Sequence, residues 1–235
     1  MKKKPLLLSF LLILVLTLSF LSPWTRPFWT FLDTYIFTFL NSTLDGNSFL
    51  QHFWALLNHK RMDLVEDAVF LGFFAWGVYV APSGTRWRRA FQFVLISALI
   101  ACVISFVNRG PVQSLFALRD SPSLVMTPCV RITQEIPWKG IKDATAASFP
   151  GDHATTLLLF GLLYAAYVPR RLGRAAWIYV GLRILPRLVV GAHWFSDIAV
   201  GSLPIALFFT ACFLYTPLEP WLTRVLEQGK RAIRL

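Results

Sequence analysis

The sequence predicts an all-α, polytopic membrane protein: a bundle of six transmembrane helices with interfacial helices in its outer loops. Three observations lead to this fold class. The 235 residues are 56% hydrophobic and only 15% charged, which is too apolar for an ordinary soluble domain. The apolar residues fall into runs close to the length that crosses a bilayer. The basic residues lie between these runs, mostly on alternate connections.

The first apolar run covers residues 5–21 and follows the basic start MKKK. A cleaved signal peptide has the same layout, with a cleavage site of small residues after the apolar run. No convincing site of that kind follows here. We therefore expect a retained signal-anchor helix.

Five further apolar runs follow, and with the first they make six expected spans. They cover residues 66–81, 91–107, 154–168, 175–190 and 195–214. Several are short for a bilayer, so we expect tilted helices or ends whose polar side chains reach the interface. No composition shift, linker, low-complexity tract or repeat divides the chain. Residues 1–235 are therefore expected to form one integral membrane domain.

The connections between the runs differ in charge, and this difference predicts the topology. Residues 1–4, 82–90, 169–174 and the tail from 215 are basic, whereas the longer connections 22–62 and 108–153 are less densely basic. Short basic connections face the cytoplasm. Both termini are therefore predicted to be cytoplasmic, with the longer loops and a tight turn near Gly191 on the outer face. This distribution explains most of the net charge of +11, so no nucleic-acid partner is predicted.

Three segments outside the spans are candidate interfacial helices. Residues 28–40 and 48–57 of the first outer loop are rich in aromatic side chains, which is typical of a belt at the membrane surface or of a substrate rim. The tail PLEPWLTRVLEQGKRAIRL is typical of an amphipathic helix on the anionic cytoplasmic leaflet. A solvated charged tail explains the same residues, so both interpretations stay open.

Arg187, His193 and Asp197 fall within eleven residues around one predicted turn between helices. Ionisable groups in membrane helices are costly and indicate functional sites. His193 and Asp197 are four residues apart at the start of the last expected span, which places both side chains on one helical face. The carboxylate can then accept the Nδ1 proton and leave Nε2 as a nucleophile or base. Arg187 can bind phosphate oxygens. Alternatively, His193 is an ordinary interfacial residue and Asp197 a charge favoured at a helix N-terminus.

The second cluster is SFPGDH, directly before the expected span 154–168. Pro150 and Gly151 shape a turn, and the amides near Gly151 and Asp152 form a candidate anion site at a helix N-terminus. His153, at the rim of that site, can donate a proton to a leaving oxygen. Plain helix capping by Asp152, with His153 incidental, is the alternative. Two histidine clusters on one predicted face favour the catalytic interpretation.

The second outer loop adds further basic residues. We expect some of them to be solvated and others to neutralise a phosphate and its transition state. They are Arg109, Arg119, Arg131, Lys139 and Lys142. The sequence has no Gly-rich nucleotide loop and no convincing metal-ligand spacing, so neither a cofactor nor a metal site is predicted. Its three cysteines form no recognisable disulfide framework.

At these residues the chain resembles the type 2 phosphatidic acid phosphatase superfamily, whose motifs are KxxxxxxRP, PSGH and SRxxxxxHxxxD. The third motif matches in spacing at Arg187, His193 and Asp197. Only its leading serine is absent, replaced by Pro186. The second motif reads PGDH at residues 150–153, which keeps the proline and the histidine and changes both residues between them.

The first motif departs most from the pattern. Arg119 is the candidate for its arginine, but the following proline is displaced to Pro122, and Val112 stands where the lysine belongs. Lys142, or failing that Arg109, would replace that lysine. The stretches RDSPSL, KDATAASFPGDH and GAHWFSD look like the lipid A 1-diphosphate synthase branch of the superfamily.

The resemblance implies a metal-independent reaction in two steps at the outer, periplasmic face of the bacterial inner membrane. His193 would attack the terminal phosphorus of undecaprenyl pyrophosphate and form a phosphohistidine, with Asp197 orienting its ring. His153 would protonate the departing lipid phosphate and later deprotonate the acceptor, the 1-phosphate of lipid A. The groups that would hold the phosphoryl oxygens are Arg119, Lys142, Arg187 and the amides near Gly151 and Asp152.

Two other functions stay open on the sequence. With water as acceptor, the same residues would give an undecaprenyl pyrophosphate or phosphatidylglycerophosphate phosphatase. A transporter or channel also explains arginine and aspartate residues within membrane helices. In the leading interpretation the partners are the two lipid substrates and the bilayer, and no cofactor is required.

Overall fold

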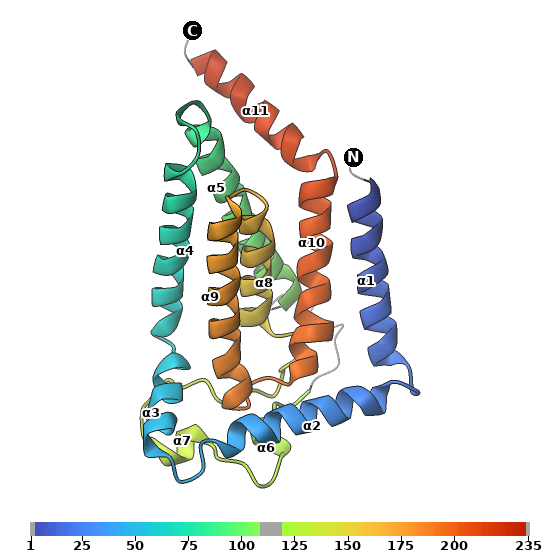
Figure 1. Cartoon of the computed structure of the whole chain (residues 1–235), viewed down its shortest axis with the longest axis vertical. Helices are drawn as coiled ribbons and strands as arrows, with labels where there is room; N and C mark the ends of the chain where they lie inside the picture. Colours follow the sequence, from blue (N-terminus) through green and yellow to red (C-terminus); the bar gives the residue numbers. More distant parts are fainter. Residues whose placement is uncertain (1–2, 109–118, 234–235) are drawn as a thin grey trace.

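Helices form every regular element in the computed structural model of the chain, which describes residues 3–108 and 119–233. Six of them run side by side as a bundle (Figure 1), which confirms the all-α fold class. These six are α1 (Lys3–Leu21), α4 (Met62–Tyr79), α5 (Arg86–Val103), α8 (Asp152–Ala165), α9 (Arg170–Val189) and α10 (Leu203–Tyr215). Short helical turns extend α5 and α10. Helix α5 is preceded by η1 (Ser83–Thr85) and followed by η2 (Ile104–Asn108), and α10 is preceded by η4 (Asp197–Ser202). Each bundle helix corresponds to one predicted apolar run.

Three helical segments in the described residues are long and apolar enough to cross a membrane: Lys3–Leu21, Ser83–Val107 and Asp197–Tyr215. The other three bundle helices differ for visible reasons. Helix α8 has only 14 residues, α4 carries three carboxylates near its start, and α9 carries several arginines. The six-span count therefore remains a prediction.

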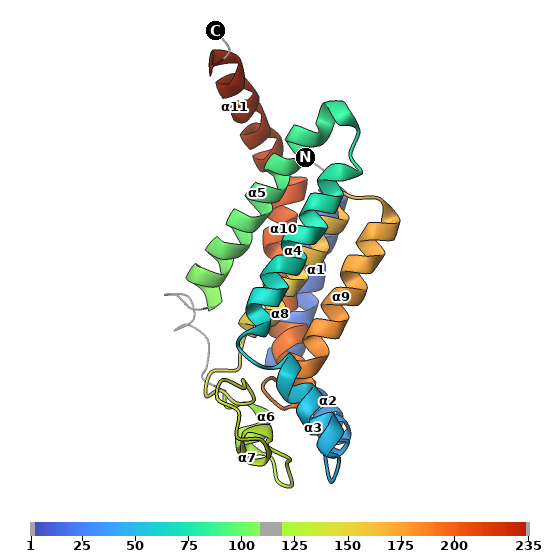
Figure 2. The same ribbon diagram turned by 90° about the vertical axis from the view of Figure 1, so that its left-hand side faces the viewer.

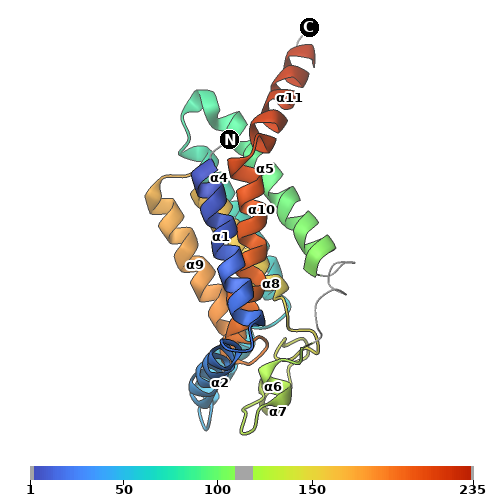
Figure 3. The ribbon, with the colours of Figure 1, turned by 90° about the vertical axis from the view of Figure 1, so that its right-hand side faces the viewer.

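The remaining helices lie at the two ends of the bundle. Helices α2 (Arg26–Ser42), α3 (Ser48–Leu57), α6 (Pro122–Val125) and α7 (Ile132–Glu135) lie at one end, and α11 (Leu218–Ile233) projects from the other (Figures 1 and 2). Both ends of the described chain lie on the α11 side, and Figure 3 shows α1 beside α10. Helices α2, α3 and α11 form where the aromatic segments and the tail predicted them.

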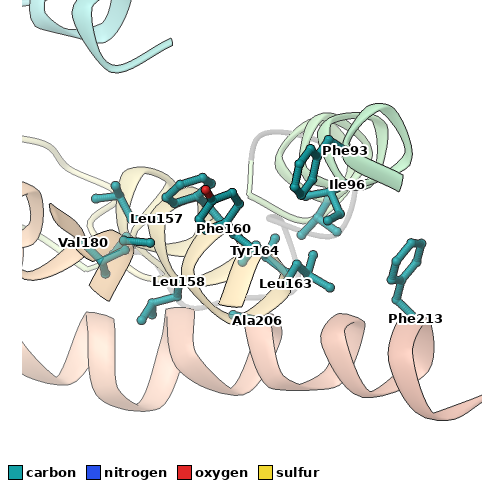
Figure 4. Close-up of a cluster of buried hydrophobic side chains, with 14 of the residues drawn as sticks. Phe93, Ile96, Leu157, Leu158, Phe160, Leu163, Tyr164, Val180, Ala206 and Phe213 are labelled. Atoms are coloured by element: carbon teal, nitrogen blue, oxygen red, sulfur yellow. The ribbon is translucent and has the colours of Figure 1, made fainter. Parts of the chain in front are cut away.

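Helix α8 occupies the centre of the bundle, and nine of its 14 residues are buried. Phe160 and Tyr164 stack on each other with ring centroids 5.3 Å apart, and Phe93 of α5 stacks on Tyr164 at 5.5 Å (Figure 4). A helix that is apolar on all sides is typical of such a central position. By contrast, α1 has no buried residue, as expected for a helix whose outer surface contacts lipid.

Helix α2 has one buried face and one exposed face. Trp29, Asp33, Phe37 and Asn41, spaced four residues apart, point into the protein. The opposite face exposes aromatic rings, with the Phe31 ring stacked on Tyr35 at 5.8 Å. Because residues four apart share a helical face, this spacing fixes α2 across the end of the bundle.

The turn at Gly191 joins α9 to the last helical segment, as predicted, and its backbone requires glycine. Its φ of +74° lies in the left-handed region that residues with a Cβ rarely adopt. A Cβ at Gly191 would also lie 2.5 Å from Phe37 Cε2 and 3.0 Å from the Ser123 amide nitrogen. The Gly191 carbonyl accepts a hydrogen bond from that amide at 3.1 Å. The second outer loop and α2 therefore both pack on this turn.

Gly191→Ala should lower the free energy of unfolding by more than the backbone strain alone, which is about 1 to 3 kcal/mol. Gly46→Ala is the matched control, because Gly46 also has a positive φ (+62°) but no atom lies within 4 Å of its Cβ position. Thermal unfolding of both variants in detergent measures the difference. Equal losses would contradict the close packing at Gly191.

Candidate active site

A cavity of about 650 Å³ lies at the end of the bundle where α4 and α8 begin and α9 ends. Both predicted histidines line it, together with basic and acidic side chains. The ionisable lining residues are Asp63, Glu66, Asp67, Lys142, Asp152, His153, Arg187 and His193. Five predicted site residues therefore share one cavity, although they are far apart in the sequence. Arg119, Gly151 and Asp197 lie outside this lining.

His193 lies in the turn after α9, against Gly151. Its Nδ1 is 2.9 Å from the Ser148 carbonyl oxygen, and since a carbonyl only accepts, Nδ1 carries the proton and donates it. This leaves the lone pair on Nε2. A Cβ on Gly151 would contact the His193 ring at 3.4 Å, so the glycine lets the loop lie directly on the imidazole.

The predicted hydrogen bond from His193 Nδ1 to Asp197 is not made, because the two atoms Nδ1 and Oδ2 are 3.8 Å apart. The helical segment begins only after Trp194, so the four-residue spacing does not place both side chains on one helical face. The Asp197 Oδ2 instead accepts the Trp194 amide at 2.8 Å. Asp197 remains the carboxylate beside His193, while Ser148 supplies the acceptor for its proton.

His153 is the second residue of α8, and its Nε2 lies 3.5 Å from the Glu66 carboxylate on α4. Its side chain is 11% exposed, and Nε2 makes no hydrogen bond within the described residues. Gly151, not Asp152, takes the N-cap position of α8. The Asp152 Oδ1 accepts the His153 amide at 2.6 Å. Asp152 is therefore the first residue of the helix and not its N-cap, so the capping alternative is wrong.

Two cations of the cavity share one carboxylate. Lys142 forms an ion pair with Asp63, and the Arg187 Nη2 lies 4.0 Å from the same carboxylate. The Arg187 Nη1 also donates to the Lys142 carbonyl oxygen at 3.2 Å, so the two basic residues are held together. Arg109, the alternative to Lys142, lies outside the described residues.

Arg119 is placed behind His193, away from the cavity lining. It donates to Asp33 at 2.6 Å, to Asp197 at 2.8 Å and to Ser196 at 2.7 Å. Its guanidinium carbon lies 4.8 Å from the Trp194 ring centroid. The structure thus separates Arg119 from the other residues predicted to bind phosphate.

Sequence reasoning missed the carboxylates of α2 and α4. Glu66 is buried and accepts a hydrogen bond from the Arg183 Nε of α9 at 3.0 Å. Asp33 pairs with Arg119 in the same way. A carboxylate at the start of an apolar run was the available signal for Glu66. Its partner lies 117 residues away, so spacing could not identify the pair.

All three cysteines are free thiols. Burial, and then the nearby Asp143 carboxylate, raise the pKa of the Cys129 thiol in the outer loop. A thiol whose pKa is raised stays protonated near neutral pH and is a poor nucleophile. Within the described residues, no group of three or more His, Cys, Asp or Glu is arranged to hold a metal ion.

Comparison with known proteins agrees with these residues. The model of the PAP2 superfamily matches residues 116–221, a range that includes both histidines. The lipid A 1-diphosphate synthase of Escherichia coli (strain K12) is 31% identical over 210 residues, covering 88% of this chain and 85% of that protein. The chain belongs to the PAP2 superfamily. No solved structure matches it.

Membership confirms the superfamily and the branch that the sequence motifs predicted. The PAP2 chain is accordingly an enzyme, a lipid phosphatase or phosphotransferase of the membrane. The motif spacing at residues 187–197 was a sound basis for this prediction, although the local geometry of Asp197 differs from the one expected.

Glu66→Ala should lower the free energy of unfolding by about 3 to 5 kcal/mol, because it leaves Arg183 buried without its carboxylate. Glu66→Leu combined with Arg183→Leu should cost clearly less, since it removes both charges together. Asp67→Ala is the control, one residue away and exposed. Thermal unfolding in detergent compares the variants. An equal, small effect of Glu66→Ala and Asp67→Ala would refute the pairing.

Proposed function

We propose that this enzyme transfers the terminal phosphate of undecaprenyl pyrophosphate to the 1-phosphate of lipid A through a phosphohistidine on His193. The observation that supports this most is the shared cavity: His193 and His153 line it together with Lys142 and Arg187. These groups provide a nucleophile, a proton donor and cations for phosphate oxygens. The similarity to a lipid A 1-diphosphate synthase supports the acceptor.

In the first step the His193 Nε2 lone pair attacks the terminal phosphorus. An N–P bond forms, the bond to the bridging oxygen breaks, and that oxygen leaves with the electron pair. His153, protonated when the anionic pyrophosphate lies beside it, gives its proton to the leaving lipid phosphate. The phosphorylated ring is positively charged, and the Ser148 carbonyl, 2.9 Å from Nδ1, stabilises it.

In the second step the same residues act in reverse. Neutral His153 takes the proton of the acceptor phosphate where one is present, and the acceptor oxygen attacks the phosphorus. The N–P bond breaks, its electron pair returns to Nε2, and the product is a 1-diphosphate. No step requires a metal ion, because the cations are supplied by Lys142 and Arg187.

The phosphoryl oxygens are assigned to Lys142, Arg187 and the backbone near Gly151 and Asp152. Phosphate then competes with Asp63, which lies against both cations. Arg119 would contact phosphate only after giving up its bonds to two carboxylates. We therefore assign Arg119 to the support of Asp197, in place of the phosphate contact implied by the superfamily pattern.

We propose that the enzyme lies in the bacterial inner membrane with both termini cytoplasmic and the cavity facing the periplasm. Two observations support this orientation. Both ends of the described chain are at the α11 end of the bundle, and the cavity is at the opposite end. The basic connections also lie toward the termini.

The acceptor separates the transferase from a phosphatase, which superfamily membership alone also permits. Purified enzyme should move label from undecaprenyl pyrophosphate to lipid A when both lipids are present, with or without EDTA. Thin-layer separation of the labelled lipids measures this transfer. Release of free phosphate alone would show that water is the acceptor, and strict dependence on divalent metal would contradict the mechanism.

His193→Ala should abolish the phosphoenzyme and reduce transfer by more than about 10³-fold, because it removes the nucleophile. His153→Ala should retain slow phosphoenzyme formation but impair turnover. His52→Ala is the control, since His52 is exposed on α3 and outside the cavity. Labelling of trapped protein measures the intermediate. Full activity of either cavity variant would refute its assigned role.

A further inference from the structure

Asp33 is a buried carboxylate on α2 that lines no part of the cavity. It is only 2% exposed. Its Oδ1 accepts the Ser196 amide at 2.8 Å, and its Oδ2 accepts the Ser196 hydroxyl at 2.5 Å and the Arg119 guanidinium at 2.6 Å. Burying a carboxylate is costly unless charge and hydrogen bonds compensate it. These three donors provide that compensation.

Arg119 connects Asp33 to the carboxylate beside the nucleophile. One nitrogen, Nη2, contacts Asp33, and the other, Nη1, contacts Asp197 at 2.8 Å and Ser196 at 2.7 Å. A guanidinium is a planar fork with fixed donor directions. Because Asp33 holds the Nη2 of Arg119, it also fixes the direction in which Nη1 points, which is toward Asp197.

Asp197 lies between Arg119 and the segment that carries His193. Its Oδ2 accepts the Trp194 amide and lies 3.8 Å from the His193 Nδ1. The Asp197 carboxylate places a negative charge directly beside the imidazole. Such a charge stabilises the cationic ring that forms when His193 is phosphorylated.

Other contacts of α2 reinforce the same turn without adding charge. The Phe37 ring packs edge-on against Trp194 with centroids 6.3 Å apart, and the Asn41 amide donates to the Val189 carbonyl at 3.2 Å. Helix α2 is thus braced against the segment that carries His193. Asp33 differs from these neighbours because it is the charged member of the buried face.

We propose that Asp33 is a positioning residue for phosphoryl transfer, holding Arg119 on Asp197 so that this carboxylate stays fixed behind His193. The inference rests on the proposed function and extends it to α2. Asp33 lines no part of the cavity and does not contact His193. A change at Asp33 should therefore lower the rate of N–P bond formation and leave substrate binding unchanged. Arg119 shares this role.

The test uses the full-length enzyme with labelled undecaprenyl pyrophosphate and follows single-turnover phosphorylation of His193. Asp33→Asn keeps the shape and removes the charge, so phosphoenzyme formation should slow by at least about tenfold with KM changed by less than about twofold. Asp45→Asn is the matched control, because Asp45 is exposed just after α2. It should behave as the wild type.

A double-mutant cycle separates positioning from general loss of stability. If Asp33 acts through Arg119, Asp33→Asn added to Arg119→Gln should slow phosphorylation little further than Arg119→Gln alone. Additive losses would overturn the proposal. If Asp33→Asn does not fold, as shown by the loss of cooperative unfolding, the single variant Arg119→Gln tests the proposal. A slower phosphorylation rate at unchanged KM would support it, and a raised KM would overturn it.

The remaining outcomes distinguish this inference from the proposed function. A wild-type phosphorylation rate in Asp33→Asn, together with its loss in His193→Ala, overturns the role of Asp33 and leaves the function intact. Absence of any phosphoenzyme in the wild type overturns both.

Discussion

The Arg119 guanidinium lies between two carboxylates, Asp33 from α2 and Asp197 at the start of η4, and the surroundings of His193 depend on this contact. A buried charge in an apolar bundle is costly unless another element supplies the opposite charge. Because of this cost, the ion pairs fix the position of Arg119: if it moved away from either carboxylate, that carboxylate would stay buried without a compensating charge. The turn that carries His193 is thereby connected to α2 and to the segment before α8 that contains Arg119.

A second buried pair stands beside the other histidine. Glu66 of α4 and Arg183 of α9 contact each other at 3.0 Å, and the same Glu66 oxygen lies 3.5 Å from His153. The two pairs use different helices, so His193 and His153 are set by separate constraints. Each histidine has a carboxylate nearby, Asp197 beside His193 and Glu66 beside His153. The bundle therefore positions the two histidines independently, and both line the same cavity.

Local sequence signals predicted much of this arrangement. Apolar runs located all six bundle helices, and the motifs located His193, His153 and Arg187, which line one cavity. Lys142, expected only as a replacement for the missing motif lysine, lines the same cavity. Predictions failed where a result depended on contacts between distant elements. The Nδ1 acceptor is Ser148 rather than Asp197 because the helix starts after Trp194, and no periodicity sets that start. Asp33 was missed because its partners are 86 and 163 residues away.

The charges of the cavity also constrain how phosphate can bind. Lys142 and Arg187 are already neutralised in part by Asp63, which is 45% exposed and so can separate from them at little desolvation cost. In the proposed reaction an entering phosphate would therefore exchange with this carboxylate. A group with more negative charge competes better in such an exchange, because the Coulomb energy grows with its charge while the cost of displacing Asp63 stays the same. On these terms the proposed donor, a pyrophosphate, would bind better than a monophosphate, and the weaker binding of the lipid monophosphate would assist its release after transfer.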